Sequence, residues 1–172
     1  SGSTILFWRF CPALLRRFDS VSCQLGERPQ DPSPWLTAAE IGLIFLLFFL
    51  YAGWQPPDVN EAHYLAKAKH YWQPDWCGGD HFLESADAHL IFYWTFGWLT
   101  LVFPLPVVAW IGRFLTWGLL AWAWRRLSWA VVPRPFVSIL TACLFLLFTS
   151  RFHMAGEWVV GGVEAKGFAY VL

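Results

Sequence analysis

Long apolar runs separated by polar segments organise this chain and predict three membrane-spanning helices. The runs occupy residues 36–53, 107–124 and 130–149. A helix needs about 20 apolar residues to cross the ~30 Å hydrocarbon core of a bilayer, and each run approaches that length. Residues 167–172 are apolar again and predict the first turn of a fourth span. The pattern therefore predicts an all-α, polytopic membrane protein, and the sequence is expected to be a fragment of a longer one.

The first span begins at a recognisable helix start. Thr37 stands three residues before Glu40, the spacing of a capping box, and the helix-incompatible linker Asp31-Pro-Ser-Pro34 precedes it. We interpret Glu40 as a cap at the membrane interface, where the helix dipole favours an acid.

Arginine is concentrated in two segments that are expected to face the cytoplasm. The amino-terminal segment, residues 1–35, contains four Arg, and residues 125–135, which include a predicted loop at 125–129, contain three Arg and no acid. Short Arg-rich segments stay on the cytoplasmic side. The chain must then cross twice between residues 35 and 125, and spans 36–53 and 107–124 supply both crossings.

The loop between these two spans, residues 54–106, is then extracytoplasmic, and so is the second loop, residues 150–166. Within the first loop we expect two interfacial helices parallel to the membrane, at about 58–72 and 88–103. The apolar part of the second holds about 14 residues, too few to cross. It also carries aromatic side chains that favour the headgroup level: Tyr93, Trp94 and Trp98.

Composition agrees with a membrane protein and excludes an ordinary soluble domain. Hydrophobic residues make up 57% of the chain, above the roughly 45–50% of soluble domains. We expect the lipid bilayer as a partner, in a bacterial inner membrane or a plasma membrane, and no nucleic acid. Of the twelve Asp and Glu residues, six fall in one part of the first loop: Asp58, Glu61, Asp75, Asp80, Glu84 and Asp87.

These carboxylates are the main candidates for chemistry. Asp58 and Glu61 have the spacing of a second capping box, but a cap does not need the neighbouring His63, Lys67 and His70. A carboxylate held beside a substrate hydroxyl or amine can act as a general base. Because the second loop is acidic as well, the two loops are expected to face each other across one membrane surface.

The sequence Trp54-Gln-Pro-Pro-Asp-Val-Asn-Glu-Ala-His-Tyr64, followed by Tyr93-Trp94 and by Arg113-Phe-Leu, resembles the amino-terminal third of GT-C glycosyltransferases. That superfamily includes lipid-A aminoarabinose transferases and protein O-mannosyltransferases. The resemblance covers roughly residues 36–172. It implies an integral membrane enzyme that moves a sugar from a polyprenyl-phosphate donor to an acceptor on the extracytoplasmic face.

The resemblance also implies a catalytic acid in each loop. Alignment on Tyr64 places Glu61 on the glutamate of the family motif and Asn60 on its catalytic aspartate, so that Asp58 stands two residues early. Either Glu61 or Asp58 would then be the base. If the base is Glu61, its replacement by Gln should leave stability nearly unchanged.

The second acid of the family would be Glu157 or Glu164, which spacing does not distinguish. Arg113, some six residues inside the second span, either has a functional role or snorkels and pins the interfacial helix. Donor binding is expected to involve polar and cationic side chains of both loops together with this arginine: His63, Tyr64, Lys67, Arg113, Arg151 and Lys166.

A divalent cation could also stabilise the leaving phosphate. Asp80, His81 and His89 supply suitable ligand types, although their spacing matches no zinc signature, and the alternative is a solvated loop with helix caps. Asp87 fits a cap for the apolar run that starts at Leu90. The rival functions are a multi-pass transporter, a haem-binding redox protein, and a non-catalytic membrane module.

Overall fold

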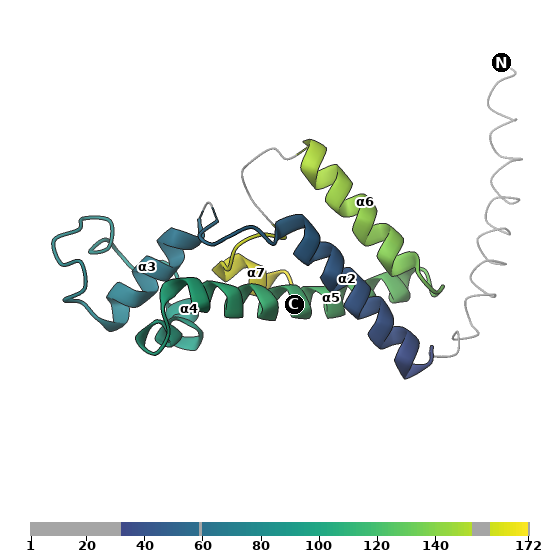
Figure 1. Ribbon diagram of the computed structural model, residues 1–172, viewed down its shortest axis with the longest axis horizontal. Coiled ribbons are helices and arrows are strands. Elements are labelled where there is room, and N and C mark those ends of the chain that lie inside the picture. Colours follow the sequence, from purple (N-terminus) through teal and green to yellow (C-terminus); the bar gives the residue numbers. More distant parts are fainter. Residues whose placement is uncertain (1–31, 59, 153–158, 172) are drawn as a thin grey trace, which may run out of the picture. The chain divides into compact units, whose positions relative to one another are not determined.

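The computed structural model describes residues 32–58, 60–152 and 159–171, and over these ranges the chain is helical without any strand (Figure 1). The predicted all-α class is therefore confirmed for the described residues. The predicted amino-terminal segment, residues 1–35, lies almost wholly outside them. The elements are α2 (Pro34–Ala52), α3 (Glu61–Trp72), α4 (Leu90–Thr95), the 3-10 helix η1 (Gly97–Leu101), α5 (Leu105–Val131), α6 (Val137–Phe152) and α7 (Ala165–Ala169).

Two of these helices, α2 and α5, are long and apolar enough to cross a membrane by length and composition. They correspond to the first two predicted spans. The apolar helix α6 has 16 residues. At 1.5 Å per residue it extends about 24 Å, which is shorter than the hydrocarbon core.

The start of α2 differs from the prediction. Ser33 is the cap, because its hydroxyl accepts a hydrogen bond from the Leu36 amide at 3.3 Å, and Pro34 occupies the first turn. The predicted capping box of Thr37 and Glu40 is wrong. Glu40 lies in the second turn, is fully buried, and pairs with Arg125 of α5.

The predicted loop at residues 125–129 is also wrong, because α5 continues without a break to Val131. Arginine is a good helix former, and the ion pair with Glu40 lets Arg125 stay inside the packed helices. The chain turns only at Pro133 and Pro135, which cannot continue a helix. As a result α6 begins at Val137, seven residues later than the predicted third span.

The helices α2 and α6 pack against α5 and against each other (Figure 1). Their shared core contains Phe48, Trp117 and Ala142, all fully or almost fully buried. The outward faces are apolar as well. Large exposed side chains occur on all three helices: Leu43, Leu46, Leu50, Phe114, Leu115, Leu140, Leu144, Leu147 and Phe148. Helices that are apolar on every face are typical of membrane spans.

The long first loop folds beside one end of α5. Its first helix, α3, ends at Trp72, where the helix expected at about 58–72 also ends, and buries Leu65 and Ala68 in a second core with Phe92 and Val108. The predicted helix at residues 88–103 is instead the short pair α4 and η1. Neither is long enough to cross a bilayer by itself, and the interfacial position of this segment stays a prediction.

Residues 160–171 return along α5. The Trp117 indole donates a hydrogen bond to the Gly161 carbonyl at 3.0 Å, and Val163 packs on Gly112 so closely that a Cβ there would stand 2.4 Å from a Val163 methyl. Further along, Gly167 lies beside Thr116. This return brings the second acidic loop to the first.

Candidate functional site

A fully buried ion pair joins the first loop to α5. Arg113 Nε donates to Glu61 Oε1 at 2.9 Å, and Arg113 Nη2 donates to Glu61 Oε2 at 2.6 Å. Both side chains have 0% exposure. The third donor of the guanidinium, Nη1, reaches the Trp54 carbonyl. Arg113 therefore does not snorkel to water, and it fixes the start of α3 on α5.

The carboxylate of Glu61 has all its acceptor positions occupied. In addition to the two bonds from Arg113, Oε1 accepts from the Val163 amide at 2.8 Å and Oε2 accepts from the Asp58 amide at 3.0 Å. A carboxylate offers about four acceptor sites, and four donors fill them here. Glu61 is thus placed to hold the structure together, and it offers no position to an incoming proton.

Asp58 meets the second loop directly. Its Oδ2 atom accepts a hydrogen bond from the Gly162 amide at 3.2 Å. The contact is close, since a Cβ built on Gly162 would lie 3.1 Å from Asp58 Cβ. Asp58 is only half-buried, in contrast to Glu61. One hydrogen bond of the predicted capping box is present, because the Glu61 carboxylate accepts from the Asp58 amide. The Asp58 carboxylate, by contrast, accepts from the Gly162 amide of the second loop.

Two residues beyond Gly162, the second loop contributes another acid and a cation. The Glu164 side chain is 5% exposed, and its Oε2 atom lies 3.1 Å from Lys166 Nζ. Among the described residues this oxygen has the ion pair but no well-oriented hydrogen bond. Glu164 is therefore the acid of the second loop that the structure brings to the first. The alternative, Glu157, lies outside the described residues.

The Tyr64 hydroxyl lies close enough to Glu164 and Lys166 for both charges to act on it. Burial raises the pKa of the Tyr64 hydroxyl, the Glu164 carboxylate raises it further, and Lys166 lowers it. The phenol ring also packs against the His89 imidazole, with 4.8 Å between ring centroids. Tyr64 consequently lies between the second loop and the part of the first loop that contains His89.

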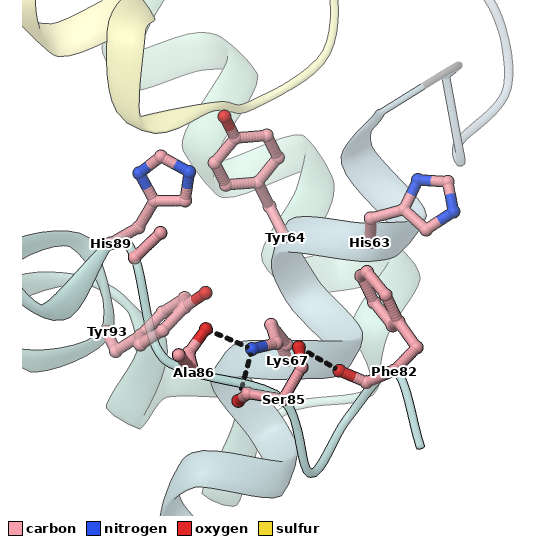
Figure 2. Close-up of a pocket in the computed structure, with 9 residues that line it drawn as sticks. His63, Tyr64, Lys67, Phe82, Ser85, Ala86, His89 and Tyr93 are labelled. Carbon is pink, nitrogen blue, oxygen red and sulfur yellow. Dashed lines mark hydrogen bonds between the residues drawn. The ribbon is translucent and has the colours of Figure 1, made fainter. Parts of the chain in front are cut away.

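A pocket of about 220 Å³ opens beside Tyr64, and we refer to it as the loop pocket (Figure 2). Figure 2 shows Tyr64 between the imidazoles of His63 and His89, with its hydroxyl directed toward the segment that leads into α7. The lining combines aromatic rings, imidazoles and a short stretch of backbone: His63, Tyr64, Lys67, Phe82, Ser85, Ala86, Ala88, His89 and Tyr93.

Lys67 shapes this pocket. Its Nζ atom donates to the carbonyls of Ser85 and Ala86, both at 2.8 Å, and lies 3.5 Å from Asp87 Oδ1. An ammonium has three donors, so these partners occupy Lys67 and neutralise its charge. The predicted cap role of Asp87 is wrong, because the residue before α4 is His89 and Asp87 pairs with Lys67 instead.

The other predicted site residues lie apart from this arrangement. Asp80 accepts from the amides of Phe82 and Leu83 at 2.8 and 3.2 Å, as expected for a turn cap. Within the described residues no three His, Cys, Asp or Glu side chains form a group able to hold a metal, and Asp80, His81 and His89 are not brought together. Arg151 is exposed at the end of α6.

Several groups essential to the arrangement carry no signal in the sequence. The amides of Gly162 and Val163 and the carbonyl of Trp54 are backbone groups, which every residue type except proline supplies in full. Gly112 lets the second loop approach α5. The only signal for it in the sequence is a small residue next to Arg113. Comparisons of the chain with protein-family models, curated proteins and solved structures found no match.

Proposed function

We propose that this chain forms the catalytic loops of an integral membrane glycosyltransferase that uses a polyprenyl-phosphate sugar donor. One observation carries the proposal: two acidic segments about 100 residues apart in sequence join at one end of α5. Gly162 donates to Asp58 and Val163 donates to Glu61. Two carboxylates with different surroundings are thereby brought to one region, because Asp58 contacts the segment that carries Glu164.

In this proposal Asp58 is the general base. It removes the proton from the acceptor hydroxyl or amine while the acceptor atom forms a bond to the anomeric carbon of the sugar. The bond from that carbon to the phosphate oxygen breaks, and the polyprenyl phosphate leaves with the electron pair. Glu61 has a supporting role, since its bonds to Arg113 and Val163 fix the positions of both segments.

Lys166 and Tyr64 are the groups proposed to face the donor phosphate. The charge of Lys166 acts on the Tyr64 hydroxyl, so both groups lie in one region beside Glu164. A positioned ammonium stabilises the negative charge that develops on a leaving phosphate. The loop pocket adjoins Tyr64 and offers the glycosyl unit aromatic walls and imidazole partners.

The proposed topology follows from the Arg distribution. The helices α2 and α5 cross the membrane, and α6 forms a third crossing in which the bilayer thins locally to match its 16 residues. The two acidic loops lie on the extracytoplasmic side with the amino terminus in the cytoplasm. This arrangement supports access of a lipid-linked donor, because the pair α4 and η1 exposes Ile91, Trp94 and Trp98 next to the site at the level of the headgroups.

The test is a transfer assay on membranes that contain the protein, supplied with a panel of radiolabelled polyprenyl-phosphate sugars. We expect transfer from at least one donor, and Asp58→Asn should reduce the rate by about 10²–10⁴, the usual contribution of a general base. Asp75→Asn is the matched control, because Asp75 is exposed on the same loop. Absence of transfer from every donor, or an active Asp58→Asn variant, would contradict the proposal.

A further inference from the structure

A second groove lies along α5, beyond the ion pair of Arg113 and Glu61, and Val159 of the second loop is part of its lining. Its floor is formed by Leu120, Ala123 and Leu127 of α5, and its walls include Phe145 of α6 and Val171 of the returning segment. The volume is about 490 Å³, and the lining is mainly apolar. A groove of this chemistry fits a hydrocarbon chain, and we refer to it as the α5 groove.

One cation stands at the mouth of the α5 groove. Arg126 lines it together with Trp122, and the guanidinium lies over the Trp122 ring, 5.0 Å from its centroid. The two residues are four apart, so they share one face of the helix. Arg126 is exposed, and the aromatic ring holds its charge at the edge of an apolar channel.

The charge at this end of α5 is one-sided. The sequence contains no Asp or Glu between residues 88 and 156. Glu40, which the structure brings to this end, is buried and paired with Arg125. Among the described residues the exposed charges here are therefore those of Arg126 and Arg134, both positive. Such a surface favours a headgroup of net negative charge over a zwitterionic one.

The position of Arg126 along α5 fits the depth of a lipid phosphate. Arg126 comes 21 residues after Leu105, the first residue of α5. At 1.5 Å per residue the two are about 32 Å apart, close to the ~30 Å thickness of the hydrocarbon core. With α5 across a bilayer, the guanidinium reaches the headgroup level, and the α5 groove extends from there toward the bilayer centre as far as Leu120, about 9 Å deeper.

We propose that the α5 groove binds an anionic phospholipid, with the phosphate on Arg126 and one acyl chain lying along Leu120, Ala123 and Leu127. Anionic lipids are recognised by basic side chains at the mouth of such clefts between membrane helices. The proposal requires α5 to cross a bilayer, and it is independent of any transferase activity.

The test uses the full chain purified in a neutral detergent with added phosphatidylglycerol or phosphatidylcholine of identical acyl chains. Thermal unfolding gives the stabilisation, and native mass spectrometry gives the number of retained lipids. We expect phosphatidylglycerol to bind more tightly, and Arg126→Gln to weaken its apparent affinity about fivefold, the effect of one basic side chain at a membrane surface. Arg134→Gln is the control, because Arg134 is exposed nearby but does not line the groove.

A second variant tests the acyl-chain part of the site. Ala123→Phe places a ring on the floor of the α5 groove and should reduce retention of phosphatidylglycerol while Arg126 remains. Inorganic phosphate should not stabilise the protein. Equal binding of the two lipids, full phosphatidylglycerol affinity in Arg126→Gln, or stabilisation by phosphate alone would each overturn the proposal. Failure of the wild-type protein to retain any lipid would overturn it as well.

Discussion

Arg113 and Glu61 form a bidentate ion pair with 0% exposure, and this pair joins α5 to the first residue of α3. The pair is also the point at which both acidic segments meet, because Glu61 accepts from the amides of Asp58 and Val163. Removing one partner of such a pair leaves a buried charge without compensation, which typically costs about 3–5 kcal/mol.

Glu61→Gln should therefore lower the free energy of unfolding by about 3–5 kcal/mol, measured in mixed micelles. This expectation is the opposite of the one drawn from the sequence, where Glu61 could be a base whose replacement leaves stability unchanged. Glu84→Gln is the control, since Glu84 is exposed and its side chain accepts a hydrogen bond from the Gly79 amide. Wild-type stability in Glu61→Gln would show that the pair does not hold the loops.

Gly112 offers a second test, because a Cβ there would stand 2.4 Å from a Val163 methyl and 2.8 Å from the Phe96 ring. Gly112→Ala should force the second loop away from α5 and destabilise the protein by about 1–3 kcal/mol. Gly118 lies on the same helix with nothing within 4 Å of its Cβ position. Gly118→Ala should be neutral or stabilising by up to about 1 kcal/mol. Equal effects of the two substitutions on thermal unfolding would refute the close packing.

Burial of the Tyr93 hydroxyl should lower the stability of the protein at high pH. Burial raises the pKa of Tyr93 to about 12, and the Asp87 carboxylate and Tyr64 contribute to the rise. Because the folded-state pKa is above the unfolded value of 10.0, this contribution is complete below pH 10 and is lost as the pH rises through about 12. The loss is on the order of 2–3 kcal/mol.

The measurement for Tyr93 is the difference between the wild type and Tyr93→Phe in unfolding free energy from about pH 9 to about pH 12.5, a window that brackets the unfolded and folded pKa values. The wild type should lose more stability than the variant in this window. Groups that do not interact with Tyr93 contribute equally to both curves and cancel, whereas Tyr64 interacts with Tyr93, and its part is included in the difference. Parallel pH curves would mean that Tyr93 ionises as freely in the folded state as in the unfolded one.

Much of this fold could be predicted from the sequence, because hydrophobic periodicity and proline positions fix local structure. Helix α3 ends at Trp72, as the predicted bounds of about 58–72 have it, and the apolar run after Leu90 forms only the short helices α4 and η1. Two of the errors share one cause. Local signals favour a cap at Glu40 and a loop at Arg125, whereas the fold pairs these two residues across 85 positions of sequence.

The site could be predicted only in part for the same reason. Residue types identify Asp58, Glu61 and Glu164 as candidates, but their roles depend on which donors surround each carboxylate. The amides of Gly162 and Val163 decide this, and backbone groups leave no trace in residue identity. By residue type Lys67 likewise suggests a phosphate ligand, but in the fold the carbonyls of Ser85 and Ala86 occupy its ammonium.

Lys166 should affect binding of the donor, if the proposed transferase activity is correct. Lys166→Ala removes the positive charge beside Tyr64 and should raise the apparent KM for the polyprenyl-phosphate donor roughly tenfold, about 1.4 kcal/mol. Lys69→Ala is the control, since Lys69 lies over the Trp76 ring on the first loop. An unchanged KM with normal turnover would show that Lys166 does not bind the donor and only forms an ion pair with Glu164.

The central claim is that the two acidic loops meet at Asp58 and Gly162, and disulfide trapping tests it most directly. A Cβ on Gly162 lies 3.1 Å from Asp58 Cβ, so a small shift brings a cysteine pair to disulfide geometry. In a background without the four native cysteines, Asp58→Cys with Gly162→Cys is oxidised in membranes, and a protease site in the turn after α5 reveals the linkage. We predict rapid, nearly complete cross-linking, with little in the control pair Asp75→Cys with Gly162→Cys. Cross-linking no faster than the control would contradict the account.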